Sequence, residues 1–327
     1  MSTIAVIGAG LAGLVVSQKL AKSHGVVVFE KSRGVGGRMS TRRAGPFEFD
    51  HGAQFFTAQS AAFRTFLEPL IEAGHIADWP ARFAELRHEQ VVDSRQWGED
   101  YPHYVGTPSM NSVGKALASG LDVRLGTAIT SLARKGGRWQ LVGDRQQPLG
   151  EFDWVIVTAP AAQTADLLAS TSIASAAAAV RMQACHALLL GFDQTVELPW
   201  QAALVHDADI SWISVNNSKP GRAASSSLVV HSTNAWADAH ADDDIDAVRR
   251  HLLAECREAT GIDTASAAFV DVHRWRYANI DRQDGDLYAL DPDQQLAACG
   301  DWFVHGRVEG AFNSADALAE RLMLGDT

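Results

Sequence analysis

The sequence TIAVIGAGLAG, residues 3–13, decides the fold of this chain. A short apolar run of β type leads into a glycine turn, Gly8 to Gly13, and apolar residues then recur at helical spacing from Leu14 to Lys22. A β-branched run at residues 26–29 follows and ends at Glu30. A strand, a helix and a second strand in this order form a βαβ unit, so the pattern predicts a parallel sheet.

The spacing of the glycines indicates a dinucleotide site. Gly8 permits the tight turn, Gly10 lets the backbone approach a pyrophosphate, and Gly13 lets helix and strand pack closely. The start of the helix then offers free N–H groups and the positive end of its dipole to the phosphates. Glu30 stands about 20 positions after Gly8, where a carboxylate accepts hydrogen bonds from an adenosine ribose. These features alone do not separate NAD from FAD.

Two further segments favour FAD. A loop at residues 33–41 contains the paired glycines Gly36 and Gly37, which let it pass close to the cofactor, and Arg38, whose forked donor offsets pyrophosphate charge. Near the C-terminus, Asp301 can accept from ribityl hydroxyls, and a helix opening at residues 309–311 would offer N–H groups to the flavin end. An NAD-only domain needs no such distant contact, whereas the longer FAD does.

The middle of the chain, about residues 161–275, changes character and indicates a second domain inserted into the first. The expected fold class is α/β: a Rossmann-like FAD-binding domain with a central parallel sheet, plus an inserted α+β substrate domain with a mostly antiparallel sheet. We expect helices at residues 63–73, 111–118 and 243–260, and strands at 123–125, 129–134, 138–142, 154–160, 187–192, 210–215, 227–231 and 268–277. The expected FAD-binding domain comprises residues 1–60, 106–162 and 285–327, and the substrate-binding domain comprises 61–105 and 163–284.

Composition argues against several classes of function. The 327-residue chain has a net charge of -11, which disfavours binding to nucleic acid or to an anionic membrane. The cysteines, Cys185, Cys256 and Cys299, form no CxxC pair and suit buried positions in a reducing cytoplasm. We find no signal peptide, no apolar stretch long enough for a membrane span, and no HxxxH-type helical pair with a third ligand, so we expect a cytoplasmic protein without a metal.

With these motifs the chain resembles the glutathione-reductase-type flavoproteins that carry a GG motif, which include amine oxidases, protoporphyrinogen oxidase, phytoene desaturase and renalase. The match covers residues 3–57, 123–160 and 299–322. It implies non-covalent FAD, with the backbone at Ile129 against the adenine and residues 54–57 beside the flavin ring. The expected cofactor-binding residues are Gly8, Gly10, Ala12, Gly13, Glu30, Lys31, Gly36, Gly37, Arg38, His51, Gln54, Phe55, Phe56, Thr57, Ile129, Asp301, Glu309, Gly310 and Ala311.

The sequence contains no second GxGxxG and no CxxC pair, which limits the types of reaction that the flavin can catalyse. The flavin has to take electrons from one substrate and pass them to dioxygen or to another diffusible acceptor. Amine oxidases of this class place a lysine near the flavin, and Lys219, the only lysine after Lys135, stands in a turn-like sequence. No tyrosine occurs in the C-terminal motif either. An ordinary amine oxidase is therefore disfavoured.

The run FDHGAQFFT, residues 49–57, and the compact middle region look most like renalase. That resemblance implies oxidation of the 2- and 6-dihydro isomers of NAD(P) to NAD(P)+, by hydride transfer to flavin N5 and reoxidation by dioxygen to give hydrogen peroxide. It implies a small-molecule dinucleotide and dioxygen as partners, and it leaves the oligomeric state open. Two alternatives remain: an amine oxidase or desaturase acting on another small substrate, and a non-catalytic FAD-binding scaffold.

The substrate-binding candidates stand on predicted strands of the middle region, and no side chain is identified as a certain catalytic residue. Trp275 and Tyr277 alternate with Arg274 and Arg276, so the two rings share one face of a strand and the two arginines share the other. Two interpretations remain for each pair. The two rings either form an aromatic wall for the nicotinamide or pack in the core, and the arginines either bind the substrate pyrophosphate or lie in solvent. The remaining candidates are Trp212 and His231, the latter as a partner for the carboxamide or as a structural group.

Overall fold

The computed structural model describes residues 1–169 and 171–324. The chain divides into two compact units. Unit 1 comprises Met1–Gly37, Val113–Met182 and Ile280–Thr327, and unit 2 comprises Arg38–Ser112 and Gln183–Asn279. Both units are therefore built from segments far apart in the sequence.

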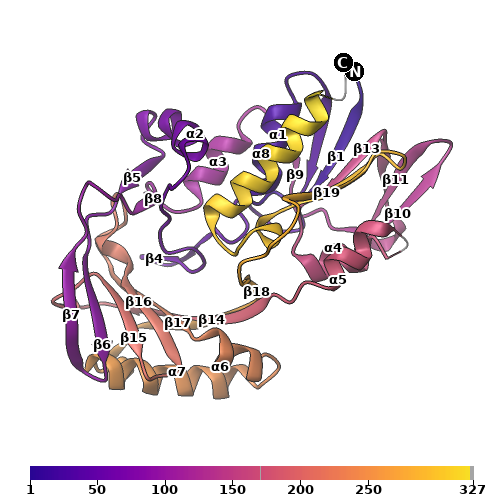
Figure 1. Cartoon of the computed structure of the whole chain (residues 1–327). Helices are drawn as coiled ribbons and strands as arrows, with labels where there is room; N and C mark the ends of the chain where they lie inside the picture. The colour runs from indigo at the N-terminus through magenta and orange to yellow at the C-terminus, as the bar shows by residue number, and fades with distance from the viewer. Residues whose placement is uncertain (170, 325–327) are drawn as a thin grey trace. The chain divides into compact units, whose positions relative to one another are not determined.

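Unit 1 is built on a six-stranded sheet with the order β19-β20-β13-β1-β2-β9 (Figure 1). Neighbouring strands are parallel except for the edge pair β19 and β20. The strands are β1 (Thr3–Ile7), β2 (Gly25–Phe29), β9 (Asp122–Arg124), β13 (Trp154–Val157), β19 (Tyr288–Asp291) and β20 (Leu296–Cys299). The central strands are apolar without alternation because both faces of the sheet are buried.

Five helices of the described part of unit 1 accompany this sheet, together with a three-stranded antiparallel sheet, β10-β11-β12. The long C-terminal helix α8 lies beside α1 (Figure 1). Lys19 of α1 forms an ion pair with Asp316 of α8. The elements are α1 (Leu11–Leu20), α3 (Ser112–Ala118, its first residue in unit 2), α4 (Ala161–Leu167), α5 (Ser172–Ala178), α8 (Val308–Leu324), β10 (Ile129–Lys135), β11 (Arg138–Gly143) and β12 (Pro148–Phe152).

Unit 2 contains a seven-stranded sheet with the order β18-β14-β17-β16-β15-β6-β7. Its neighbours are antiparallel except for the parallel pair β15 and β6. The strands are β6 (Arg82–Arg87), β7 (Gln90–Gln96), β14 (Gln183–Phe192), β15 (Ala202–His206), β16 (Ile210–Val215), β17 (Ser226–Ser232) and β18 (Phe269–Asn279). Two small hairpin-like pairs complete the strands, β3 (Thr41–Ala44) with β4 (Phe47–Asp50) and β5 (Ile76–Asp78) with β8 (Tyr104–Gly106).

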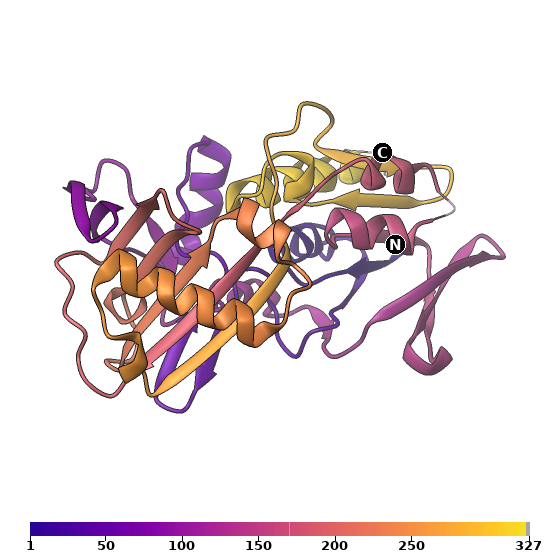
Figure 2. The same ribbon diagram turned by 90° about the horizontal axis from the view of Figure 1, so that it is seen from below.

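The two faces of the seven-stranded sheet have different coverings. Helix α7 (Ile245–Thr260) runs along one face, where Val248, Leu252 and Cys256 join a core with Leu188 and Leu190 (Figure 2). On the other face, Phe47 and Phe49 of β4 pack on Ala187, Leu189 and Val229. Strand β14 is covered on both faces, which explains its unbroken apolar sequence. The other helices of unit 2 are α2 (Ala61–Glu72) and α6 (Asn234–Ala239).

The fold confirms the predicted class: a Rossmann-like unit with a central, mostly parallel sheet, and a separate unit rich in antiparallel strands. Residues 38–60, expected with the FAD-binding segments, pack with unit 2 because β4 shares the core of that unit. Sequence analysis gave no strands for the segment where β5 to β8 form. β7 is exposed along its whole length, so no alternation of buried and exposed residues marks it. Among the described residues, no helix combines the length and apolar character of a membrane span.

Candidate functional site

The carboxyl ends of the parallel strands of unit 1 meet at one edge of the sheet. Because β1, β2, β13 and β20 run in the same direction, the residues that follow them gather at this edge. These residues include Gly8 after β1, Glu30 after β2 and Asp301 shortly after β20. Open α/β sheets bind ligands at this edge. The fold therefore brings together the three segments that contain Gly8, Glu30 and Asp301, which the sequence analysis had identified separately.

The two glycine loops of unit 1 lie against each other. Gly10 and Gly36 form an isolated parallel bridge, and the Gly36 N–H donates to the carbonyl of Ala9 at 2.8 Å. A Cβ at Gly37 would lie 3.2 Å from the Cα of Gly10. At Gly13 a Cβ would lie 1.9 Å from the carbonyl oxygen of Gly8, which is why helix α1 can begin so close to β1 only with glycine.

Glu30 is buried at the end of β2 and is oriented by the glycine turn. Its carboxylate accepts from the backbone N–H of Ala9 at 2.8 Å and of Ser32 at 2.7 Å, and each oxygen keeps acceptor capacity for a ligand. The Thr127 N–H donates to the Glu30 carbonyl, which holds the start of β10, with Ile129, beside this strand end. Lys31 is exposed and donates to Gln163, so its side chain is engaged with α4.

The C-terminal segment contributes a second helix start to unit 1. Asp301 is buried directly after β20, and Glu309, Gly310 and Ala311 form the first turn of α8. A Cβ at Gly310 would lie 2.5 Å from the carbonyl oxygen of His305, so this turn also depends on a missing side chain. Asp301 and Glu309 both have polar partners in the fold.

The glycine turn has the properties that a bound diphosphate requires. No side chain caps the start of α1 at Gly10 among the described residues. The first N–H groups of a helix have no intrahelical acceptor and need another partner. A Cβ placed on Gly10 would meet no atom within 4 Å, so open space lies directly in front of these donors. Ala12 is buried in the first turn behind them. The residues of unit 1 therefore fit FAD.

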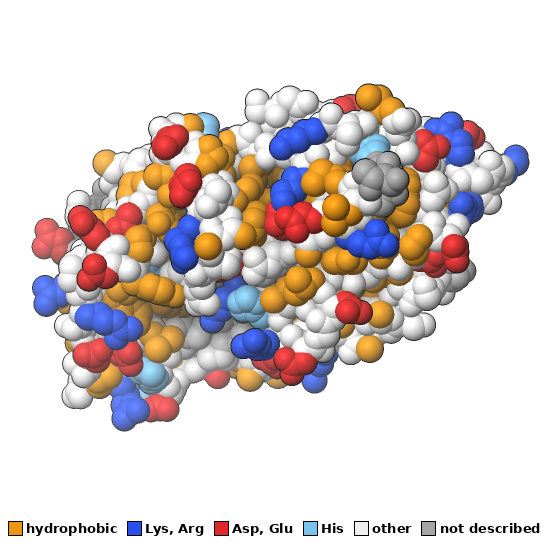
Figure 3. All heavy atoms as spheres, turned by 45° about the horizontal axis from the view of Figure 1, so that its top comes forward, with side chains coloured by type: hydrophobic (Ala, Val, Ile, Leu, Met, Phe, Trp, Pro, Cys, Tyr) orange, Lys and Arg blue, Asp and Glu red, His pale blue; other side chains and the backbone are white. Residues whose placement is uncertain are grey.

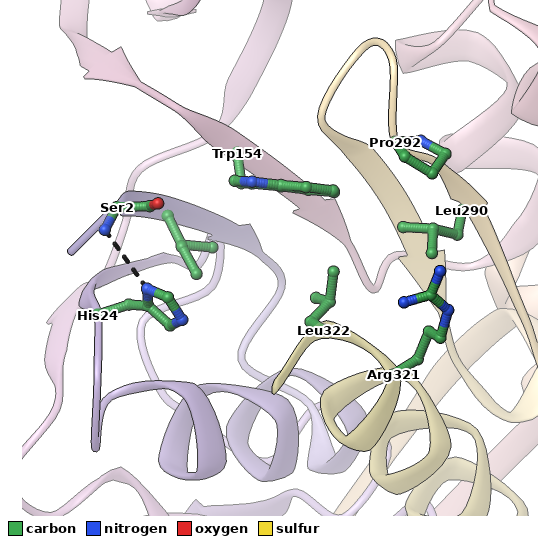
Figure 4. A pocket seen from close by; sticks show the side chains of 8 residues that line it. Ser2, His24, Trp154, Leu290, Pro292, Arg321 and Leu322 are labelled. Carbon is green, nitrogen blue, oxygen red and sulfur yellow. Dashed lines mark hydrogen bonds between the residues drawn. The ribbon is translucent and has the colours of Figure 1, made fainter. Parts of the chain in front are cut away.

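A hollow at the opposite edge of the same sheet is unrelated to these motifs. It has a volume of about 190 Å³ and lies between the amino ends of β1 and β13 and the last turns of α8. Figure 4 shows Trp154 and Leu322 facing it, with His24 accepting from the Ser2 N–H at 3.4 Å. The glycine turn follows the carboxyl end of β1, so the hollow and the dinucleotide motif lie at opposite ends of the strand.

In unit 2, four side chains stand in one row across four strands. Trp212 of β16 pairs with His231 of β17, His231 pairs with Ala187 of β14, and Ala187 pairs with His273 of β18. Directly paired residues point to the same face of a sheet, here the face that β4 covers. Ala187 itself is fully buried in the cluster with Phe47 and Phe49. Trp275 stands two residues along β18 on this face as well.

The loop after β4 lies on this row. The His51 ring stacks on Trp275 at 5.2 Å between ring centres and meets His273 edge-on at 4.7 Å. The His51 carbonyl accepts from Trp275 Nε1 at 2.8 Å and lies 3.2 Å from His231 Nε2. Burial lowers the pKa of His51, His231 and His273 to about 4 each. All three rings are therefore neutral at pH 7.

A fully buried ion group stands behind this loop. Asp50 accepts from Arg222 and lies 3.5 Å from Lys219 Nζ. Burial alone would raise the pKa of Asp50, but the charges of Lys219 and Arg222 hold it below its usual value. Burial lowers the pKa of Lys219 to about 8, although Asp50 acts in the opposite direction. Lys219 also donates to Gln54 Oε1 at 3.1 Å, so the ion group supports the loop.

Gln54 connects the ion group to the row of rings. Its Oε1 accepts from Ser214 at 2.6 Å, and its Nε2 donates to the carbonyl oxygens of Asp50 and Gly52. Gln54 Nε2 also lies 3.3 Å from His231 Nε2. Every polar atom of the Gln54 amide is thus used to hold the loop in place.

The remaining predicted residues of unit 2 lie in two other environments. Phe55 packs against Trp212, Trp97 and His103 with ring centres 5.0 to 5.4 Å apart. Phe56 is buried and exchanges backbone hydrogen bonds with Tyr104, and Thr57 accepts from Tyr101 at 3.4 Å. Arg38 donates to the carbonyl of Ala278 at 3.0 Å, and Tyr277 is half-buried at the end of β18.

The structure separates Arg274 from the rings beside it in sequence. Arg274 donates to the carbonyl of Asp243, and Arg276 forms an ion pair with Asp242 at 2.8 Å. Both arginines therefore contact the connection between α6 and α7, on the face of β18 opposite to Trp275. Sequence reasoning overlooked Asp50, Lys219 and Arg222 as a unit. The only signal was that Lys219 is the last lysine of the chain.

Comparison with known proteins agrees with this architecture. Residues 6–70 match the model of an NAD(P)-binding Rossmann-like domain, and residues 58–323 match that of flavin containing amine oxidoreductases. A curated 4,4'-diapophytoene desaturase of Staphylococcus haemolyticus is 52% identical over 50 residues, which are 15% of this chain and 10% of the desaturase. The chain thus aligns with only a small part of that relative.

Solved structures share the fold over almost the whole chain. A putative protoporphyrinogen oxidase from Exiguobacterium sp. 255-15 superposes with a TM-score of 0.78 at 12% identity, covering 99% of both chains. A putrescine oxidase variant gives 0.72 at 12% identity over 99% of both chains. An oxidoreductase from Methanosarcina mazei also gives 0.72, at 13% identity over 97% of this chain and 100% of the other.

The family model extends over most of the chain and includes elements of both units. The Rossmann-like model covers the glycine turn and the start of α1, and the amine oxidoreductase model covers the C-terminal helix α8 up to residue 323. The chain belongs to the family of flavin-containing amine oxidoreductases, and it is an FAD-dependent oxidoreductase.

Proposed function

We propose that this flavoenzyme oxidises mis-reduced nicotinamide dinucleotides, the 2- and 6-dihydro isomers of NAD(P), to NAD(P)+. The resemblance of residues 49–57 to renalase suggests this substrate. The observation that carries the proposal is the charge of the three histidine side chains beside Trp275 in unit 2. His51, His231 and His273 are all neutral at pH 7.

A cationic amine would find little to bind among these rings. Asp50 is the only buried carboxylate in residues 38–112 and 183–279, all of which are described, and Arg222 and Lys219 already engage it. Placing an ammonium group beside neutral rings without a free counter-charge costs desolvation energy. A dihydronicotinamide ring is neutral, flat and largely apolar, so it suits an aromatic wall better.

The chemistry that bound FAD supplies is two-electron oxidation, with dioxygen as the final acceptor. The balanced reaction combines dihydro-NAD(P), dioxygen and one proton to give NAD(P)+ and hydrogen peroxide. No protein acid or base has to act on the donor, because loss of a hydride makes its ring aromatic. The chain has only to hold the ring and exclude water.

We assign three kinds of role to the residues. Trp275, Tyr277 and Trp212 are the proposed wall for the substrate ring. Gln54 and His231 are positioning residues, because their polar atoms contact the loop at 50–54. The residues of unit 1 that we propose to hold FAD are Gly8, Gly10, Ala12, Gly13, Glu30, Gly36, Gly37, Ile129, Asp301, Glu309, Gly310 and Ala311.

Amine oxidation is the second candidate, and two observations favour it. The family model is named for amine oxidoreductases, and one structural neighbour is a putrescine oxidase. A buried lysine whose pKa is lowered to about 8 is also well suited to take up and release protons near neutral pH. This alternative predicts turnover of primary amines or polyamines.

Oxygen consumption distinguishes the two candidates. The purified, FAD-loaded protein is supplied in air with borohydride-treated NAD+, which contains the dihydro isomers, or with NADH or putrescine. We expect oxygen uptake with matching peroxide formation for a minor component of the borohydride-treated material, and little with the other two. Turnover of putrescine alone would replace the proposal with the amine candidate, and no turnover of any of them would contradict both.

A further inference from the structure

A group of three metal-ligand side chains lies on the α7 side of the sheet in unit 2. His251 and Glu255 project from α7, and Asp209 stands in the turn between β15 and β16. One ligand atom from each residue lies within 4.8 Å of the other two, the only such group of three among the described residues. Figure 2 shows α7 lying across the strands of this sheet. The residues that we propose for substrate binding, Trp212, His231 and Trp275, lie on the opposite face of this sheet.

The geometry is close to that of a metal site before the metal enters. His251 and Glu255 are four positions apart on α7, so their side chains lie on the same side of the helix. Asp209 Oδ2 is 2.8 Å from His251 Nε2, and Glu255 Oε2 accepts from the Asp209 N–H at 2.8 Å. Ligand atoms about 2.0–2.2 Å from a common tetrahedral zinc ion are about 3.3–3.6 Å apart. Asp209 and His251 therefore need to separate only slightly, and Glu255, whose ligand atom lies within 4.8 Å of theirs, needs a small side-chain movement.

The imidazole of His251 is also fixed by its neighbour. The ring of Trp236 lies parallel to it, with 4.7 Å between ring centres and an angle of 8° between planes. This contact leaves the edge of the His251 ring directed at Asp209. The side chains of His251 and Asp209 are 39% and 43% exposed, so an ion can reach them from solvent.

We propose that Asp209, His251 and Glu255 bind one divalent late first-row metal ion, with Zn²⁺ as the probe of choice. An imidazole nitrogen with two carboxylate oxygens suits Zn²⁺, whereas Mg²⁺ and Ca²⁺ prefer oxygen ligands alone. Two carboxylates and a neutral imidazole balance the charge of a divalent cation. Water completes a four-coordinate shell.

The bound ion would fasten the turn at residues 207–209 to α7. Asp207 in this turn has a positive φ of 56°, which is an uncommon conformation for a residue other than glycine. The ion therefore connects a turn with unusual backbone to α7, which packs on this face of the sheet. The proposed role is structural, and it is independent of the proposed substrate.

The chain offers few competing ligands for such a probe. His88 pairs with Glu258 at 3.3 Å and His240 with Asp243 at 2.7 Å, but neither pair has a third ligand atom in reach among the described residues. The cysteines are all buried, and burial raises the pKa of the Cys185 and Cys256 thiols to about 12 and that of Cys299 still further. Thiolates will therefore not compete.

Calorimetric titration of Zn²⁺ into the chelator-treated, FAD-loaded protein tests the proposal. We expect one equivalent to bind, and a rise in melting temperature of a few degrees that Mg²⁺ does not reproduce. His251→Ala and Glu255→Gln should each weaken binding by about tenfold or more, since each removes a ligand from a three-ligand site. His88→Ala, on an exposed histidine–glutamate pair that involves the same helix, should bind like the parent.

A second readout covers the case in which a variant is destabilised. Co²⁺ in place of Zn²⁺ gives visible absorption bands whose intensity reports four-coordinate geometry, and these bands should disappear in Glu255→Gln, which keeps the shape of the side chain. The proposal is overturned if the parent protein binds no Zn²⁺. It is also overturned if folded His251→Ala and Glu255→Gln bind Zn²⁺ as tightly as His88→Ala.

Discussion

Asp50 sets the charge balance of the interior of unit 2, because it faces both Arg222 and Lys219 without solvent. Replacing it by Asn would leave two buried cations without a counter-charge. We expect Asp50→Asn to lower the free energy of unfolding by about 3–5 kcal/mol. Urea unfolding of the FAD-loaded protein measures this loss, with the exposed Asp93→Asn as the matched control. Equal midpoints for the two variants would contradict the account.

The buried histidines make the stability depend on pH. In the folded protein the pKa values of His51, His231 and His273 are lowered to about 4, whereas unfolding restores values near 6.5. Between these limits the unfolded chain binds more protons, so stability falls as pH decreases from about 6.5 towards 4. Above pH 7 this contribution no longer changes.

The variant His231→Gln isolates one of these protons. Glutamine keeps a donor for the His51 carbonyl but does not titrate. The free energy of unfolding is measured from about pH 7 to 5 and plotted against pH. The slope of this plot should be smaller for the variant, by up to about 1.4 kcal/mol per pH unit, which is the contribution of one proton. An unchanged slope would mean that His231 titrates normally in the folded state.

At the residue scale, the role of a residue could be predicted when its structural partners are close to it in the sequence, and it could not be predicted when they are far away. The role of Gly13 depends on Gly8, five positions earlier, so the turn was visible in the sequence, although Thr158 also packs against both glycines. The burial of Lys219 depends on Asp50, 169 positions away, and nothing in the segment around Lys219 records that partner. The residue was therefore interpreted as an ordinary turn residue, although the fold buries it completely.

Among the elements, α1 offers the sharpest test, because two of its glycines differ in what surrounds them. A Cβ at Gly13 would collide with the Gly8 carbonyl, so Gly13→Ala should disturb the turn itself. A Cβ at Gly10 meets only open space, so Gly10→Ala should fold normally and yet bind FAD about tenfold or more weakly, since the methyl group occupies the phosphate position.

Equilibrium titration of the apoprotein with FAD, together with melting curves, separates these two effects. Gly98→Ala is the control, because its Cβ also meets nothing within 4 Å and it lies outside the motif. If Gly10→Ala binds FAD as tightly as Gly98→Ala does, the glycine turn is not part of the cofactor site.

Element prediction succeeded where hydrophobic pattern and burial coincide. β1, β2 and α7 are apolar on the faces that they bury, so their pattern identified them. β14 extends four residues before its predicted start because Gln183 to His186 pair with β18 in spite of two polar side chains. β7 was missed because all seven of its residues are exposed, which leaves no pattern to detect.

At the scale of the whole molecule, the sequence indicated the α/β class with a Rossmann-like part, while the order of the strands in the sheet of unit 2 could not be predicted from it. The parallel pairing of β6 with β15 joins residues more than 100 positions apart, and no local signal encodes that choice. Acidic and basic side chains are interspersed on the face drawn in Figure 3, in keeping with a small-molecule enzyme rather than a nucleic-acid binder.

The pH dependence of turnover follows from the charge states of unit 2. The three buried histidines stay neutral above about pH 5, and Lys219 titrates only near 8. Oxidation of a dihydronicotinamide, which is uncharged at its ring, should therefore proceed at a constant rate between about pH 5.5 and 7. A rate that rises steadily with pH in this range would indicate an amine, whose neutral form becomes more abundant with increasing pH.

The most direct measurement is the anaerobic reduction of the flavin in a single turnover. The yellow, FAD-loaded protein is mixed without oxygen with the separated dihydro isomers of NAD, with NADH and with putrescine, and the loss of flavin colour is followed in time. We expect rapid bleaching by a 2- or 6-dihydro isomer and slow bleaching by NADH and putrescine. Bleaching by putrescine with no response to either isomer would contradict it.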